Sequence, residues 1–198
     1  MPSSTRRARE RAGTRDRIIE AALTVLENEG AAALTIRRIA ADVDYTAPVV
    51  YQHFAGKDAL VLELVGHGYR LMMAELGGPA DEPDIDQRMV RVARAYVRFA
   101  NQHPHLYQAM NDATIGADAR RQAAEASIGL VTELLTTWSR THGVPLAAPE
   151  EACEIAWGAL YGIASLGSLG SIAPDRTERL AEQALTAILQ GWRSSAGL

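Results

Sequence analysis

Residues 46–57 carry side chains suited to reading the edges of DNA bases and to gripping the phosphates beside them. The amide of Gln52 can form two hydrogen bonds with adenine, and the small apolar Ala47 and Pro48 suit the methyl group of thymine. Hydroxyl, imidazole and ammonium groups bind phosphates, which fixes the register on DNA without selecting a sequence. We assign this second role to a set of four polar residues: Thr35, Tyr51, His53 and Lys57.

A helix must present these side chains, and the sequence predicts two short helices joined by a turn. Ile36, Ile39, Ala40 and Val43 recur at the spacing of one helical face, so the first helix packs inward through them. Thr35 stands just before this face as an N-cap. Such a helix-turn-helix is a device for placing its second helix in the major groove of DNA.

The second short helix follows a turn at Asp44 and Tyr45. Pro48 is tolerated in its first turn, where no backbone donor is lost. Two apolar residues face inward, Val50 and Phe54. The predicted outward residues are Thr46, which is also the N-cap candidate, and Ala47, Pro48, Tyr51 and Gln52. Tyr51 could instead pack against the core of this small domain.

A further helix from about residue 14 to Gly30 completes a three-helix unit through the stripe Ile19, Ala22, Leu23 and Leu26. Residues 51–60, YQHFAGKDAL, resemble the Y-x-H-F-x-x-K-[ED]-x-L signature that ends the DNA-binding domain of tetracycline-repressor-like (TetR) regulators. The resemblance extends back to about residue 14. It departs from the family pattern at Asp44 and Tyr45, where glycine and a small aliphatic residue are usual, and at Pro48.

Charge is divided unevenly along the chain. The net charge is -4, but residues 1–17 hold six arginines against two acids and so carry +4, which leaves -8 for the rest. A mobile arginine-rich arm at residues 1–13 can approach phosphates or a minor groove, and an acidic body would keep away from DNA. The arm could instead be a solubilising tail.

Composition indicates an all-α protein of about nine helices, with a DNA-binding domain at 14–56 and a ligand-binding and dimerisation domain at 57–198. No segment approaches the ~20 apolar residues of a membrane span, and no signal-peptide core follows the basic start. Cys153 is the only cysteine, which favours the cytoplasm. The helices expected beyond the DNA-binding domain cover 57–76, 84–103, about 106–110, 118–142, 149–171 and 175 onward. Capping boxes are expected at Asp84–Gln87 and Asp175–Glu178.

The last two helices predict a homodimer interface. Four glycines of the eighth helix, at 158, 162, 167 and 170, open flat patches, although interior glycine costs about 0.5–1 kcal/mol relative to alanine. The family resemblance implies that these helices form a four-helix dimer interface, and packing within one chain is the alternative. The predicted interface residues are Gly158, Gly162, Leu166, Ala184 and Ile188.

Aromatic and methionine side chains of the fourth to eighth helices predict a small-molecule site. Residues 157–162 resemble the W-x-x-x-H-G signature of one group of TetR ligand-binding domains, with Tyr161 in place of the histidine. No lysine or arginine cluster is expected there, so we expect a mostly apolar effector. A filled core is the alternative for each of the ten residues: Met72, Tyr96, Phe99, His103, Tyr107, Met110, Leu134, Trp138, Trp157 and Tyr161.

Chemistry for catalysis is sparse. His103 and His105 flank a proline and have no carboxylate at helical i+4 spacing, so we expect neither a metal site nor a cofactor. The serines at 165, 168 and 171 have no nearby histidine to activate them. The sequence therefore favours a ligand-responsive repressor that binds double-stranded operator DNA away from any membrane. The alternatives are a helical DNA-binding protein without small-molecule sensing and, less favoured, a helical enzyme that retains a helix-turn-helix.

Overall fold

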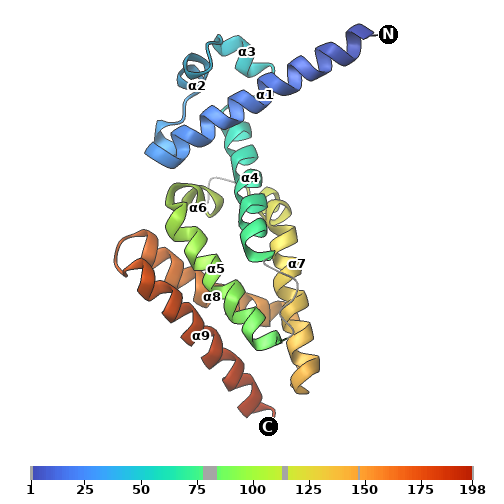
Figure 1. The fold of residues 1–198 in the computed structure, drawn as a ribbon, viewed down its shortest axis with the longest axis vertical. Helices are drawn as coiled ribbons and strands as arrows, with labels where there is room; N and C mark the ends of the chain where they lie inside the picture. Colours follow the sequence, from blue (N-terminus) through green and yellow to red (C-terminus); the bar gives the residue numbers. More distant parts are fainter. Residues whose placement is uncertain (1, 78–83, 113–115, 147, 198) are drawn as a thin grey trace. The chain divides into compact units, whose positions relative to one another are not determined.

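The computed structural model of the protein describes residues 2–77, 84–112, 116–146 and 148–197, and all of its regular structure there is helical (Figure 1). This confirms the predicted all-α fold. The helices are α1 (Pro2–Glu29), the 3-10 turn η1 (Ala31–Ala33), α2 (Ile36–Asp42), α3 (Ala47–Tyr51), α4 (Lys57–Gly77), α5 (Ile85–Gln102), α6 (Pro104–Met110), α7 (Ala117–His142), α8 (Pro149–Ser168) and α9 (Pro174–Ser195).

The chain divides into two compact units. Unit 1 comprises Met1–Gly68 and His105–Arg121, and unit 2 comprises Tyr69–Pro104 and Gln122–Leu198. Helix α4 therefore contributes to both units. Unit 1 is larger than the predicted reader at 14–56, and the division of function at residue 57 stays a prediction.

The core of unit 1 lies between α1 and the two helices that follow it (Figure 1). Ile18, Ala22 and Leu26 of α1 are buried completely, as are Ile39 of α2 and Val50 of α3. The predicted α1 stripe was partly wrong. Its buried face contains Ile18 and Val25, while two expected members are half-buried, Ile19 and Leu23. Both sets fit a 3.6-residue period, so the spacing alone did not decide the register.

Residues 2–13, expected to form a flexible arm, are the first turns of α1. Arg6 Nε donates to the carboxylate of Glu10 at 2.9 Å, and the hydroxyl of Thr14 donates to the Glu10 carbonyl at 3.0 Å. Arginine and alanine are good helix formers, and an i,i+4 ion pair adds support, so this segment can continue the helix. Its flexibility in solution stays a prediction.

Helix α6 belongs to unit 1 because its side chains pack on α1 and α4. The Nδ1 of His105 donates to the Glu27 carbonyl at 2.9 Å, and its ring lies against Gly30. A Cβ at Gly68 would come within 2.7 Å of the Met110 sulfur, so glycine permits a close approach there. These contacts hold the start of α6 against the end of α1.

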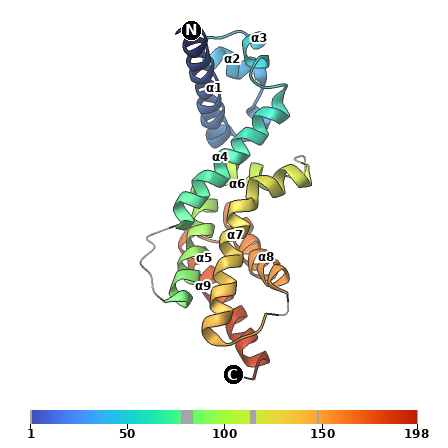
Figure 2. The ribbon, with the colours of Figure 1, turned by 90° about the vertical axis from the view of Figure 1, so that its right-hand side faces the viewer.

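Unit 2 is built around α5, which packs against α8 and α9 (Figure 2). Phe99, Leu135 and Trp138 are completely buried in it. The buried Thr177 of α9 accepts a hydrogen bond from Asn101 Nδ2 at 2.8 Å. A Cβ at Gly167 would lie 2.7 Å from Asn101 Oδ1, so this glycine serves packing within the chain.

Several predicted helix ends differ from the structure. Helix α8 ends at Ser168, and Gly170 adopts the positive φ of the following turn. Helix α9 begins at Pro174 without a side-chain cap, so the predicted Asp175–Glu178 capping box was wrong. Glu178 instead binds Arg98, 80 positions earlier. Among the described helices, none is both long and apolar enough to cross a membrane.

Candidate DNA interface and sensing surfaces

The helix-turn-helix forms as the sequence predicts, with one difference in capping. The hydroxyl of Thr35 accepts from the Arg38 backbone N–H at 3.2 Å, which confirms it as the N-cap of α2. Thr46 is the N-cap residue of α3, but its hydroxyl makes no capping bond there. The prediction therefore placed the N-cap at the correct residue, but the capping hydrogen bond that it implied does not form. Its exposed hydroxyl is left facing solvent, where DNA could engage it.

The turn between α2 and α3 explains one departure from the family pattern. Asp44 has a φ of 56°, in the left-handed region that glycine adopts without steric cost. Aspartate tolerates this region better than most residues do. The backbone N–H of Tyr45 donates to the Ala40 carbonyl at 2.8 Å, so the turn closes despite the substitution.

The predicted recognition surface is exposed. Thr46, Pro48 and Gln52 face solvent, Ala47 is half-buried, and Tyr51 is 55% exposed. Tyr51 therefore does not pack into the core of unit 1, which was the alternative for this residue. Val50 and Phe54 are buried as expected. Contact of these outward residues with DNA stays a prediction.

Two predicted phosphate contacts have other interactions in this structure. Lys57 Nζ donates to the Ala31 carbonyl at 2.8 Å, so its ammonium group lies beside η1. Burial lowers the pKa of His53, and the positive charges of Arg11 and Arg15 lower it further. This lowering favours the neutral imidazole of His53 in the free protein, and its contact with a phosphate stays a prediction.

Three arginines of α1 contact the helix-turn-helix, which the sequence analysis missed. Arg11 donates to the Gln52 carbonyl at 3.3 Å. The guanidinium of Arg15 lies 5.2 Å from the centroid of the Phe54 ring, and that of Arg17 lies 5.2 Å from the Tyr45 ring centroid. An arginine count could not reveal these contacts, because it records charge and not the partner that each side chain meets.

The predicted ligand residues are divided between the two units, and a ligand site that they share stays a prediction. Tyr107 and Met110 lie in unit 1, and the other eight lie in unit 2. Six of the ten are buried: Met72, Phe99, Tyr107, Met110, Leu134 and Trp138. His103 packs against Phe99 with ring centroids 5.0 Å apart. For these buried residues a filled core remains the alternative to a ligand cavity.

One aromatic cluster does assemble from the predicted set, and it consists of Tyr96, Trp157 and Tyr161. Trp157 Nε1 donates to the Tyr96 hydroxyl at 3.2 Å, and the Trp157 and Tyr161 ring centroids are 5.4 Å apart. Trp157 is 50% exposed. The cluster therefore presents the exposed Trp157 ring on unit 2, beside the half-buried Tyr96 and Tyr161.

Trp138 belongs to a different cluster centred on Asp86. Its Nε1 donates to Asp86 Oδ1 at 2.9 Å, and Arg193 donates to the same carboxylate at 3.0 and 3.1 Å. His142 Nε2 lies 2.9 Å from Asp86 Oδ2. Burial acts to raise the pKa of Asp86, but the hydrogen bonds from Trp138 and Arg193 and the nearby positive charges lower it overall. Asp86 is thus an ionised tie between α5, α7 and α9.

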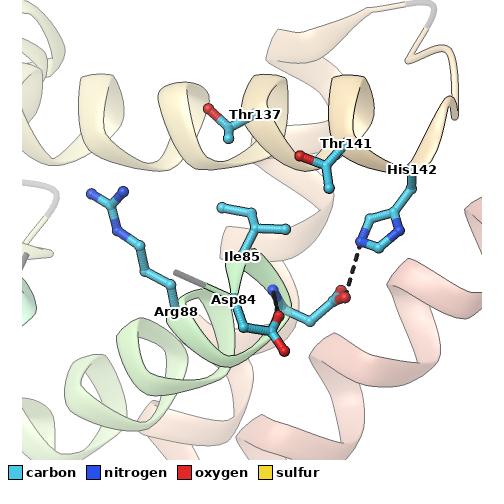
Figure 3. A pocket seen from close by; sticks show the side chains of 7 residues that line it. Asp84, Ile85, Arg88, Thr137, Thr141 and His142 are labelled. Atoms are coloured by element: carbon cyan, nitrogen blue, oxygen red, sulfur yellow. Dashed lines mark hydrogen bonds and ion pairs between the residues drawn. The ribbon is translucent and has the colours of Figure 1, made fainter. Parts of the chain in front are cut away.

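Two hollows border Asp86 on the surface of unit 2, and both are lined by a mixture of charged, polar and apolar side chains. The smaller, of about 220 Å³, has Thr137 and Thr141 of α7 facing Ile85 of α5 (Figure 3). The larger, of about 560 Å³, is lined by Arg91, Arg94 and Arg98. None of these arginines is among the ten predicted ligand residues, so the expectation of a ligand site without an arginine cluster stays a prediction. The three arginines lie three and four positions apart, which places them on one face of α5, a signal present in the sequence.

The predicted dimer face is open in the single chain. Gly158 and Gly162 are exposed, and a Cβ at either would meet nothing within 4 Å. Leu166 is 45% exposed, and Ala184 and Ile188 of α9 are half-buried. Two further exposed apolar residues continue the α8 surface, Ile155 and Leu169. Packing within the chain therefore accounts for Gly167 but not for Gly158 and Gly162.

Within the described residues, no group of three histidine, cysteine, aspartate or glutamate side chains is arranged to hold a metal ion. Cys153 is buried, and its thiol pKa is raised by that burial. A raised pKa keeps the thiol protonated at neutral pH, which disfavours attack by a thiolate there.

The exposed helix-turn-helix, carried by an all-helical chain, defines a DNA-binding regulator. Residues 18–64 match the family model described as bacterial regulatory proteins, tetR family, and residues 89–188 match the Tetracyclin repressor-like, C-terminal domain. The chain belongs to the TetR family of transcriptional regulators. The narrower resemblance to the W-x-x-x-H-G group stays a prediction.

Similar proteins from two bacteria agree with this assignment. An uncharacterised HTH-type transcriptional regulator of Mycobacterium tuberculosis, Rv0681, is 28% identical over 160 residues, which cover 79% of this chain and 71% of that protein. The uncharacterised HTH-type regulator YobS of Bacillus subtilis is 27% identical over 96 residues. That match spans 48% of this chain and half of the length of YobS.

The fold also has a solved counterpart. A protein of unknown function from Rhodococcus sp. RHA1 superposes with a TM-score of 0.76 at 22% identity, covering 89% of this chain and 94% of that chain. At this identity the likeness concerns the fold alone.

Proposed function

We propose that this regulator is a homodimeric repressor that binds a palindromic operator and is released from it by a small, mostly apolar effector. The observation that carries the proposal is the exposed outer surface of α3, where Pro48, Tyr51 and Gln52 face solvent on a helix of unit 1. Gln52 and the apolar Ala47 and Pro48 meet base edges, and Thr35, Tyr51, His53 and Lys57 meet phosphates. A regulator of operator DNA works in the cytoplasm, the location that we predict.

Dimerisation is supported by the open face of α8 and α9. Exposed Ile155, Gly158, Gly162 and Leu166 follow one another at helical spacing along α8. Glycines without a packing role in the chain allow a second copy to approach closely. A two-fold dimer presents two recognition helices, so the half-sites lie about one helical turn or somewhat more apart.

The effector site is supported most directly by Tyr96, Trp157 and Tyr161. Their rings offer apolar surface, and the hydrogen bond from the Trp157 indole N–H to the Tyr96 hydroxyl holds two of them together. This composition suits a neutral or weakly polar ligand. Helix α4 contributes residues to both units, which makes it the natural element to carry a ligand signal toward the DNA reader.

A second candidate is an anionic effector, favoured by the arginine-lined hollow on α5. Arg98 holds Glu178 through two contacts, at 3.1 and 2.6 Å, whereas Arg94 contacts Glu178 and Glu182 only at 3.4 and 3.7 Å. A ligand carboxylate or phosphate could compete for Arg94. We rank this reading second because intrachain carboxylates already lie on this face.

A thermal-shift screen separates the two effector classes. The compounds are matched apolar and anionic sets, and each stabilising compound is then titrated into protein bound to operator. The proposal expects stabilisation by apolar compounds and a fall in operator affinity of about 5- to 150-fold, the usual scale of allosteric coupling. Stabilisation by anions alone favours the second candidate, and stabilising compounds that leave operator affinity unchanged contradict ligand-controlled release.

We propose no catalytic activity for the chain. A regulator binds its effector and leaves it chemically unchanged, whereas an enzyme that retains a helix-turn-helix would convert it. Each stabilising compound is recovered after long incubation with the protein and analysed by mass spectrometry. Unchanged compound is expected, and steady turnover would favour the enzyme.

A further inference from the structure

The recognition helix α3 is too short to set its own orientation. It contains five residues, Ala47–Tyr51, and isolated helices of this length are not stable in water. Its buried side is anchored through Val50 alone among its own residues. The direction in which Gln52 and Tyr51 point must therefore depend on contacts made with the two ends of α3.

Arginines of α1 supply contacts at both ends. At the C-terminal end, Arg11 donates to the carbonyl of Gln52, the residue predicted to read adenine. Carbonyls at a helix C-terminus lack partners within the helix, so this donor occupies a group that the helix leaves open. At the N-terminal end, the guanidinium of Arg17 lies over the ring of Tyr45 in the turn that leads into α3.

Arg15 of α1 contacts the segment that follows α3. Its guanidinium lies over the ring of Phe54, and its NH2 group binds the Glu63 carboxylate of α4 at 2.5 Å. A cation–π contact restrains the positions of both side chains, because its energy depends on the cation lying over the ring face. All of these residues belong to unit 1.

We infer that Arg11, Arg15 and Arg17 are positioning residues that fix the recognition helix, and that the exposed Arg7 and Arg9 are the α1 arginines that bind phosphates. This inference rests on the proposed role of α3 in reading the operator. It divides the +4 charge of residues 1–17 into two functions. Arginines near α3 act on sequence discrimination, and arginines nearer the N-terminus act on affinity for any DNA.

Salt dependence distinguishes the two roles. A side chain that neutralises a phosphate releases counterions, so its removal reduces the slope of log affinity against log salt by about 0.9 and weakens operator and unrelated DNA alike. A positioning arginine makes no phosphate contact. Its removal should leave the salt slope and the affinity for unrelated DNA unchanged while lowering operator affinity.

The variants are Arg17→Ala and the matched control Arg9→Ala, measured by fluorescence anisotropy on an operator selected by the parent protein and on an unrelated duplex of equal length. We expect Arg17→Ala to lower operator affinity by about threefold to tenfold with an unchanged salt slope. We expect Arg9→Ala to reduce the salt slope by about 0.9 and to lower the affinities for the operator and for unrelated DNA by the same factor. Circular dichroism and melting confirm that each variant is folded.

Tyr45→Leu tests the inference without removing the charge. If Arg17 acts through the Tyr45 ring, this variant loses operator affinity to a similar extent, and the double variant loses no more than either single variant. A reduced salt slope with equal weakening on both duplexes for Arg17→Ala overturns the inference, and so does an absence of effect on either duplex. Failure of the parent protein to select any operator would instead contradict the proposed function.

Discussion

Arginines are used differently in the two units of this regulator. In unit 1 the arginines around the helix-turn-helix lie over aromatic rings or donate to the end of α3, as Arg17 and Arg11 do, and Arg15 also binds the Glu63 carboxylate of α4. In unit 2 they bind carboxylates on other helices, as Arg98 binds Glu178 and Arg193 binds Asp86, and Arg193 also lies 5.4 Å from the centroid of the Trp138 ring. The first pattern orients a small exposed element, and the second ties long helices together. The comparison indicates that arginines of unit 1 act mainly on the orientation of α3, whereas arginines of unit 2 act mainly on the packing of helices against one another.

The largest effect is expected where unit 2 is open. Gly162→Arg should split the proposed dimer, because burying an unpaired guanidinium at an interface costs about 3–5 kcal/mol. The space around Gly162 accommodates a side chain in one chain, so the variant should stay folded. Sedimentation at micromolar concentration measures the result. Ala126→Arg, at an exposed position of α7, is the control that should remain dimeric. A stable, folded monomer for the unmodified protein would remove the basis of this prediction.

Sequence discrimination should depend on unit 1 alone. Gln52→Ala should relax specificity at one base pair in each half-site by about 1–3 kcal/mol. Lys57→Ala should weaken all sequences to a similar degree, since a phosphate contact does not distinguish bases. Binding to a panel of operator mutants measures both variants. If each variant keeps the strength and ranking of the parent, the base and phosphate assignments are wrong.

Acid should act on the Asp86 tie of unit 2. The pKa of Asp86 is lowered in the fold, so its stabilising contribution is present above the unfolded value near 3.9 and is lost as the pH falls through the folded value. Asp86→Asn should lower the free energy of unfolding by about 1–2 kcal/mol at pH 7, a figure already reduced for a carboxylate that is 39% exposed. The melting temperature of the variant should also fall less steeply than that of the parent as the pH is lowered. Asp175→Asn is the control, because Asp175 is 74% exposed and pairs with Arg179 of its own helix. Equal acid profiles for the parent and Asp86→Asn would show that this tie does not govern the melting.

The smallest effect concerns the turn of the helix-turn-helix. Asp44→Gly should stabilise the protein by up to about 1 kcal/mol, because glycine adopts the left-handed φ of 56° without steric cost. Asp44→Ala should destabilise it for the opposite reason. Thermal melting of both variants measures the change. A lower melting temperature for the glycine variant would mean that the Asp44 side chain stabilises the turn by more than its backbone strain costs.

The sequence predicted best those features whose determinants are adjacent. The Thr35 cap of α2, the Asp84 cap of α5 and the turn at Asp44 each depend on a few neighbouring residues. Asp84 accepts from the backbone N–H groups of Asp86 and Gln87, as its place before an apolar stripe indicated. Short-range hydrogen bonds of this kind follow directly from residue type and spacing.

Features that need distant partners were predicted less well. Contacts around the helix-turn-helix join residues 41 and 48 positions apart, whereas those of unit 2 join residues 52, 80 and 107 positions apart. Glu178 was expected to cap its own helix, but Arg98 binds it instead. Trp138 was assigned to a ligand site and lies buried against the Asp86 cluster. Residue type identified both side chains as important, and only the fold could supply their partners.

Selection of operator sequences from a random duplex library tests the central claim most directly. The purified parent protein is used, and the enriched duplexes are sequenced and then bound at defined stoichiometry. A two-fold dimer reading through α3 predicts an enriched palindrome, bound by two chains, with half-sites about one helical turn or somewhat more apart. Gly162→Arg should lose the enrichment of the paired half-sites. Enrichment of no sequence, or of one asymmetric site bound by a single chain, would contradict the account.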